Sequence, residues 1–153
     1  MATWTMTSTS MASMSEAAIV NVILDSEALS VLAHPDERGS SRRRSRLVAR
    51  TIAELGGLGF IPAPVLAEVS HGRRSVGIHR VIKEHVVINT NPRIALRAGD
   101  LLHRNGLGSE HAVDAFVAAT AIECGASVIL TCDPDDMRRL VGRHPATTIR
   151  SID

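Results

Sequence analysis

The sequence is poor in aromatic residues, in lysine and in cysteine. Only 2% of its 153 residues are aromatic, which argues against nucleic-acid binding by stacking bases on aromatic rings. Lys83 is the only lysine, so the positive charge is almost entirely arginine. The two cysteines, Cys124 and Cys132, form neither a C-x-x-C pair nor a disulfide framework. This pattern predicts a reducing cytoplasm, with both thiols serving as small core residues.

The sequence also lacks a long apolar run and a marked excess of charge. No segment is apolar over the length needed to cross a bilayer, so no membrane association is expected. Hydrophobic residues make up 44% of the chain. The 17 basic residues nearly balance the 16 acidic ones, which gives a formal net charge of +1. Residues 1–17 are rich in Met, Ser, Thr and Ala and lack the features of a signal peptide. They are predicted to form a disordered extension before one domain at residues 18–153.

Short β-branched runs alternate with helical patterns along the remaining chain. Strands are predicted at residues 19–24, 59–61, 86–88, 127–130 and 147–149, and helices at 27–33, 42–55, 62–69, 76–84, 92–105, 109–123 and 134–141. This alternation predicts an α/β sandwich with a mainly parallel sheet.

Four carboxylates lie in unusually apolar surroundings. Asp25 ends the most apolar strand, and Asp133 follows the strand that ends at Leu130. Glu68 lies one turn into its helix, and Asp114 lies in the second turn of a helix that is apolar nearly all round. Since ligands of open parallel sheets bind beyond the carboxyl ends of the strands, these four side chains are expected to converge there.

Each carboxylate also has a purely structural interpretation. For Asp25 and for Asp133, taken alone, a cap of the helix that follows is as good an explanation as a ligand. Glu68 alone is better explained as a first-turn acid that complements the helix dipole. Asp114 could instead be paired with a buried arginine, because an unpaired buried carboxylate is costly.

Taken together, the four carboxylates indicate a metal site. Converging negative charges repel one another unless a cation neutralises them. Oxygen ligands without His or Cys favour Mg²⁺ or Mn²⁺ over zinc. A metal-activated water is a natural nucleophile for a phosphodiester.

Four motifs resemble those of the PIN-domain family, in particular the VapC-type toxins of bacterial toxin–antitoxin pairs. They are Leu24-Asp25-Ser26-Glu27-Ala28-Leu29, Pro64-Val-Leu-Ala-Glu68-Val69, Val113-Asp114-Ala-Phe-Val-Ala-Ala119 and Leu130-Thr131-Cys132-Asp133-Pro-Asp-Asp136. The likeness extends from about Ile19 to Ile149. It implies a three-layer α/β/α sandwich and an endoribonuclease dependent on Mg²⁺ or Mn²⁺. It also implies an RNA substrate, a VapB-like antitoxin and a homodimer.

The resemblance assigns roles to individual residues. It implies an acidic catalytic site of Asp25, Glu68, Asp114 and Asp133, with Asp25, Asp114 and Asp133 as metal ligands. The hydroxyls of Ser26 and Thr131 would support this site. Glu27 departs from the family, which commonly has Ser or Asn there, and Glu27, Glu110 and Asp136 are possible additional acids. Asp135 and Asp136 compete with Asp133 for the fourth role, and Asp133 is preferred because it comes directly off the strand.

Arginines cluster before and within the second predicted helix. Arg42, Arg43, Arg44 and Arg46 oppose the dipole at a helix start, so local stability does not explain them. They are predicted to contact RNA phosphates or an acidic segment of an antitoxin, although a solvated helix start is the simpler interpretation. Arg73-Arg74 and Arg138-Arg139 are weaker candidates for the same role.

Two other functions remain open at this stage. One is a degenerate PIN domain that binds RNA or a partner without cleaving it, and Glu27 keeps this interpretation open. The other is an aspartate-based phosphotransfer domain. Such domains need a lysine beside the acidic pocket, whereas Lys83 precedes a strand rather than following one.

Overall fold

A computed structural model describes residues 19–35, 39–71 and 76–153. The predicted N-terminal extension and the Arg73-Arg74 pair lie outside these residues. Five strands form one fully parallel sheet in the order β3-β2-β1-β4-β5. They are β1 (Asn21–Leu24), β2 (Gly59–Pro62), β3 (Val86–Ile88), β4 (Ser127–Thr131) and β5 (Thr147–Ser151).

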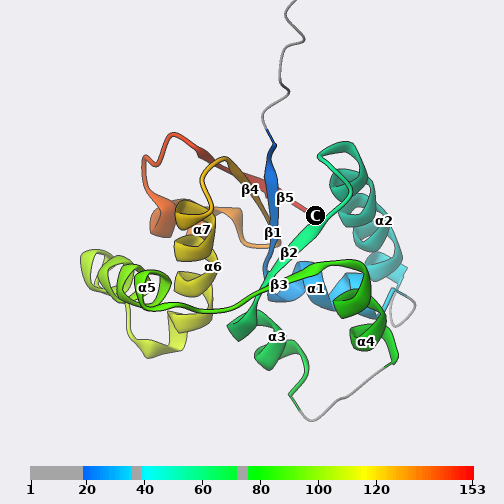
Figure 1. Cartoon of the computed structure of the whole chain (residues 1–153), viewed down its shortest axis with the longest axis horizontal. Coiled ribbons are helices and arrows are strands. Elements are labelled where there is room, and N and C mark those ends of the chain that lie inside the picture. Colours follow the sequence, from blue (N-terminus) through cyan, green and yellow to red (C-terminus); the bar gives the residue numbers. More distant parts are fainter. Residues whose placement is uncertain (1–18, 36–38, 72–75) are drawn as a thin grey trace, which may run out of the picture.

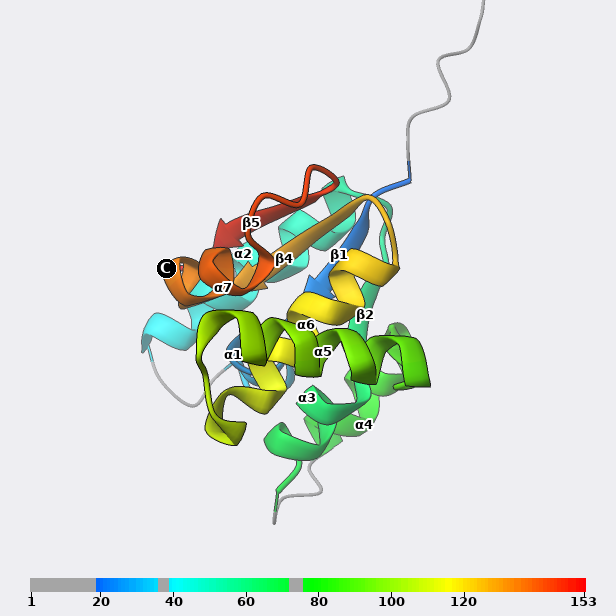
Figure 2. The ribbon, with the colours of Figure 1, turned by 90° about the vertical axis from the view of Figure 1, so that its left-hand side faces the viewer.

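Helices cover both sides of the sheet, so the molecule is the three-layer α/β/α sandwich expected (Figure 1). The helices are α1 (Ser26–Ala33), α2 (Gly39–Glu54), α3 (Ala63–Val69), α4 (Val76–Glu84), α5 (Pro92–Asn105), α6 (Ala112–Glu123) and α7 (Pro134–Val141). Helices α1, α2 and α4 lie on one side, and α5, α6 and α7 lie on the other (Figure 1). Figure 2 shows α5 outside α6, with α7 beside them.

The central strands and the helix α6 form the core. Ile23, Leu24, Ile129 and Leu130 are fully buried, as expected for parallel strands covered on both faces. Helix α6 is buried along most of its length because it lies between the sheet and α5. Within the described ranges, no helix has the length and apolar character of a membrane span.

Two predicted element starts differ from the structure. The first strand begins at Asn21, whereas Ile19 is 85% exposed. The Asn21 side-chain amide donates to the carbonyls of Cys124 and Ala126 at 3.0 and 3.2 Å, which joins the start of β1 to the turn before β4. Helix α2 begins at Gly39, three residues before the predicted start at Arg42.

A third difference concerns the start of α6. The helix predicted at 109–123 is divided: residues Ser109–His111 form a separate 3₁₀ turn, and α6 begins at Ala112. Asp114 therefore lies in the first turn of α6 and not in the second. Asp114 is therefore nearer than predicted to the N-terminus of α6, which lies at the carboxyl edge of the sheet.

Helix α4 packs closely against the end of α1. The Arg80 guanidinium donates to the Leu32 carbonyl at 2.8 Å and so satisfies an otherwise unpaired group in the last turn of α1. A Cβ atom on Gly77 would lie 1.9 Å from the Ala33 carbonyl oxygen. Only glycine therefore permits this approach of α4 to the helix that begins beside Asp25.

Gly77→Ala is expected to lower the free energy of unfolding by about 1–3 kcal/mol, because the added methyl group forces α4 away from α1. Gly99→Ala is the matched control, since a Cβ there meets nothing within 4 Å in the middle of α5. The control should gain up to about 1 kcal/mol from helix propensity. Urea denaturation measures both values. Equal effects of the two substitutions would contradict the close packing.

Candidate acidic active site

A pocket of about 300 Å³ opens at the carboxyl edge of the sheet. It lies where the strand order reverses, between β1, which continues to β2 and β3 on one side, and β4, which continues to β5 on the other. Such switch points are where open α/β sheets bind ligands. We call this hollow the acidic pocket; its walls are formed by Asp25, Ser26, Glu27, Glu68, Asp114, Thr131, Cys132, Asp133, Asp136 and Met137.

Asp25 is the most deeply buried acid of the pocket. Only 8% of the residue is exposed, and one carboxylate oxygen accepts the Ala28 backbone N–H at 2.8 Å as the N-cap of α1. Burial raises the pKa of Asp25 to about 6, with a smaller contribution from the charge of Asp114; hydrogen bonds from Thr131 and Ala28 act in the opposite direction. The capping interpretation is therefore correct, and the same residue also faces the pocket.

Thr131 connects the ends of β1 and β4. Its hydroxyl oxygen accepts the Asp133 backbone N–H at 2.9 Å, and the hydroxyl also bonds to the Asp25 carboxylate. Because the oxygen is already an acceptor, its hydrogen is available to Asp25. The hydroxyl thus orients the Asp25 carboxylate and fixes the turn that leads to Asp133.

The negative charges of the neighbouring acids act on Asp114. Burial raises its pKa most, followed by the charge of Glu68, with smaller contributions from Asp136 and Asp133 that His111 partly offsets. No ion pair to Asp114 forms within the described part of the chain, so the buried-arginine interpretation is wrong. A half-buried carboxylate surrounded by carboxylates is a natural position for a cation.

Glu68 reaches the pocket from α3. It is the sixth of seven residues in that helix, so the interpretation as a first-turn acid that complements the dipole is wrong. A carboxylate in the last turn is unfavourable with respect to the helix dipole. The Ser26 hydroxyl donates to Glu68 Oε2 and thereby ties the end of α3 to the start of α1.

The three neighbouring aspartates after β4 have different surroundings. Asp133 caps α7 by accepting the Asp136 backbone N–H at 3.3 Å, and both residues line the pocket. Asp135 points away: its side chain is 90% exposed and bonds to Arg138 at 2.8 Å. Asp133 and Asp136 therefore both remain candidates for the fourth acid, and Asp135 does not lie in the pocket.

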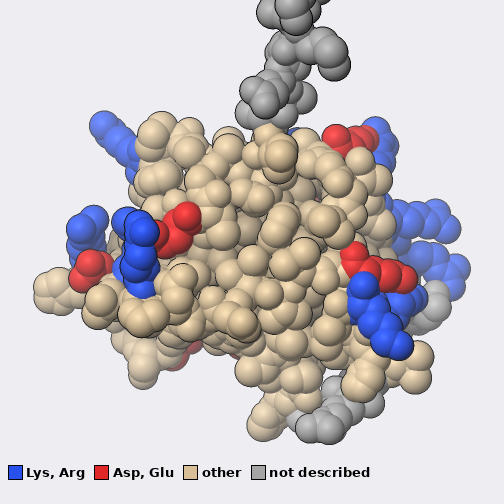
Figure 3. Space-filling view, viewed as in Figure 1, with Lys and Arg blue, Asp and Glu red and all other residues tan. Residues whose placement is uncertain are grey.

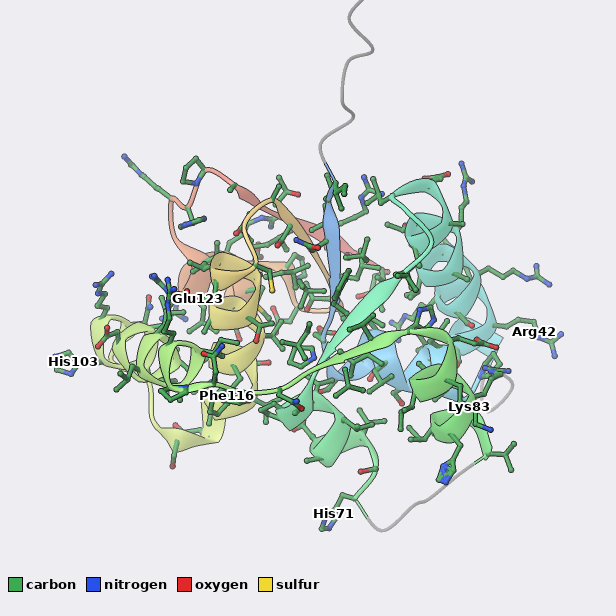
Figure 4. All side chains as sticks on the ribbon, in the orientation of Figure 1. Arg42, His71, Lys83, His103, Phe116 and Glu123 are labelled. Atoms are coloured by element: carbon green, nitrogen blue, oxygen red, sulfur yellow. The ribbon has the colours of Figure 1, made fainter. Side chains whose placement is uncertain are left out.

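Glu27 lines the rim of the pocket beside an arginine of α2. Arg44 lies 3.5 Å from Glu27 Oε1 and also pairs with Asp153. Arg44 therefore partly neutralises the one acid that departs from the family pattern. Arg42, Arg43 and Arg46 are exposed on the same helix, and Arg42 projects away from the sheet (Figure 4).

Two sequence expectations are not met at the pocket. Glu110 does not line it, because Glu110 belongs to the 3₁₀ turn and so does not share a face of α6 with Asp114. Both cysteines were expected in the core, and each is only partly buried: Cys132 packs against the core from the pocket wall, and Cys124 follows the last residue of α6. Burial raises the pKa of the Cys132 thiol to about 12, so Cys132 is neutral and unsuited to act as a thiolate nucleophile.

The donors of the pocket fit a hydrated hard cation. All the charged donors that line it are carboxylates, and the thiol among them is protonated. Among the residues described, no three His, Cys, Asp or Glu side chains converge tightly enough to hold one ion between them. A cation that keeps several waters and takes one or two carboxylates, as Mg²⁺ does, matches this arrangement better than zinc.

Comparison with known proteins identifies relatives of the chain. The model of the PIN domain family matches residues 22–142. No curated protein matches the chain. Among solved structures, a chain of VapBC2 from Rickettsia felis bound to a DNA fragment from their promoter is similar, with a TM-score of 0.57 and 14% identity; the match covers 88% of the present chain and 100% of that one.

Proposed function

Because the chain belongs to the PIN domain family, we propose that it is a metal-dependent endoribonuclease and the toxin of a VapBC-type pair. The observation that carries the proposal is the acidic pocket, in which Asp25 and Asp114 have raised pKa values in the company of four further acids. A fold without catalytic function would gain nothing from such repulsion. The repulsion between these carboxylates favours the binding of a cation, which in turn attracts a phosphate.

The proposed roles follow from position and burial. Asp25 and Asp114 would hold Mg²⁺ or Mn²⁺, and Asp133 or Asp136 together with Glu68 would orient a water bound to the ion. When bound, the ion would supply the positive charge that neutralises the pocket and attracts a phosphate, and the Lewis acidity that activates a water. Ser26 and Thr131 position Glu68 and Asp25 through their hydroxyls. The products would carry 5′-phosphate and 3′-hydroxyl ends.

A VapB-like antitoxin and a second copy of the chain are the proposed protein partners. The similar fold of a VapBC2 chain supports the antitoxin as a partner. Arg42, Arg43 and Arg46, which are exposed on α2, would contact RNA phosphates or an acidic antitoxin segment. A phosphotransfer domain is disfavoured because no lysine lines the acidic pocket, and Lys83 lies in the last turn of α4.

The decisive experiment is an RNA cleavage assay with purified protein. Structured RNA is incubated with Mn²⁺, with Mg²⁺ or with EDTA, and the ends of the products are mapped. Cleavage with either metal and none with EDTA is expected. Binding of RNA without cleavage under any metal condition would identify a non-catalytic PIN domain instead.

A further inference from the structure

The acidic pocket is the first of three hollows that follow one another along α7. A small pocket of about 80 Å³ shares Asp114 and Asp136 with it. That connecting pocket shares Arg139 and Leu140 with a third cavity of about 430 Å³. The shared residues make the three hollows neighbours along α7.

The third cavity has the opposite charge. It lies between the second half of α5, the end of α7 and the turn that follows α7. We call it the arginine-lined cavity; its polar lining consists of Arg97, Arg104, Asn105, Arg139, Arg143 and His144. No acidic residue lines it. An anion is therefore the ligand that its electrostatics favour.

The arginines of this cavity differ in what they already bind. Arg97 pairs with Glu123, whose side chain is only 12% exposed, so Arg97 joins α5 to α6. Arg104 and Arg143 have no ion-pair partner within residues 19–35, 39–71 and 76–153. Arg139 Nη1 lies 3.8 Å from Asp136 Oδ1, at the boundary with the connecting pocket. Arg104 is favourably placed in the last turn of α5 with respect to the helix dipole, but among the described residues neither Arg104 nor Arg143 is held by an ion pair, so both are available to a ligand.

On the face shown in Figure 3, the charged side chains lie on two flanks of the molecule. Seen as in Figure 3, the middle of the face is largely uncharged, with Lys and Arg over α2 on one side and over α5 and the turn after α7 on the other. Glu123 lies on the α5 side, whereas Arg42 and Lys83 lie on the opposite side (Figure 4). The arginine-lined cavity is thus separate from the arginine cluster of α2.

We propose that the arginine-lined cavity holds a phosphate of the RNA strand close to the bond that is cleaved, with Arg104 and Arg143 as its phosphate contacts. This inference rests on the proposed function. From Asp136 to Val141, α7 advances by only about 8 Å along its axis. A phosphate in the cavity therefore belongs to a nucleotide near the scissile one. The shortage of aromatic residues leaves phosphate contacts as the main source of affinity.

The test measures RNA binding and pocket chemistry separately. A fluorescent single-stranded RNA is titrated in EDTA, so that it is not cleaved, at several salt concentrations. Arg104→Ala/Arg143→Ala should bind more weakly than the parent, and the slope of log affinity against log salt should fall by about 0.7 for each arginine. Lys83→Ala removes an exposed cation from the other flank and should leave both quantities nearly unchanged.

Hydrolysis of bis(p-nitrophenyl) phosphate with Mn²⁺ is the second readout, because this small diester occupies the acidic pocket alone. The double variant should hydrolyse it at the parental rate, which also shows that the variant is folded. An unchanged RNA affinity and salt slope in the double variant would overturn the inference. So would loss of binding to a polyglutamate peptide with full RNA binding retained, since the cavity would then be a peptide site.

Failure of the proposed function gives a different result. If the parent protein binds RNA without cleaving it, the nuclease assignment fails. Weaker RNA binding by the double variant would still support the cavity as a phosphate site.

Discussion

Asp114→Asn is expected to slow RNA cleavage by about 10²- to 10³-fold without loss of the fold. Asn keeps the shape of the side chain but removes the charge that is repelled by Glu68, Asp136 and Asp133. The variant should therefore be at least as stable as the parent in EDTA, while its affinity for a divalent cation falls. Single-turnover cleavage with saturating enzyme measures the rate, and thermal melting measures the stability.

Asp135→Asn is the matched control for this prediction. The substitution is chemically identical and lies on α7 next to Asp136, but Asp135 is exposed and pairs with Arg138 outside the pocket. Its cleavage rate should stay within about twofold of the parent, since surface ion pairs contribute little. Equal loss of activity in both variants would mean that the acidic pocket is not the catalytic centre.

Asp25→Asn is expected to stabilise the metal-free protein, and the gain should depend on pH. The pKa of Asp25 is about 6 in the folded state against an ordinary value of 3.8. The folded state therefore binds more protons than the unfolded state in this range, and stability is lost as the pH rises. The parent protein thus loses roughly 3 kcal/mol of its free energy of unfolding as the pH rises from about 4 to about 7. Asp25→Asn has no carboxylate at this position and avoids that loss.

The measurement compares denaturation midpoints of the parent and Asp25→Asn in EDTA at pH 4.5 and pH 7.5. The advantage of the variant should be small at the lower pH and several times larger at the higher pH. Mn²⁺ should reverse the order at pH 7.5, because a cation stabilises the parent by binding the folded state only. A variant advantage that is the same at both pH values would show that Asp25 is not the titrating group.

Much of the acidic pocket could be predicted because it depends on local patterns. An acid directly after an apolar strand lies at the carboxyl end of that strand wherever the strand is placed, which locates Asp25 and Asp133. The parallel sheet then brings these ends together at the switch point. Asp114 could be recognised because burying an unpaired carboxylate in an apolar helix costs free energy, which indicates that the carboxylate binds something.

Other features depend on contacts between distant segments and could not be predicted. Glu68 and Ser26 meet because the end of α3 lies near the start of α1. Arg44 pairs with Glu27 and Asp153, so its role could not be separated from that of its neighbours Arg42 and Arg43 in the sequence. The arginine-lined cavity combines residues of α5 with residues that follow α7, and no sequence motif joins them.

The pairing of β1 with β4 sets the time at which the proposed activity can appear. Asn21 binds the carbonyl of Cys124, 103 residues further along the chain, and Leu24 is paired with Leu130 just before the two aspartates. During synthesis the first half of the pocket leaves the ribosome long before the second. A nascent chain therefore has no assembled acidic pocket with which to attack the messenger or the ribosome that produces it. Hydrolysis becomes possible only after β4 and α7 have emerged and folded.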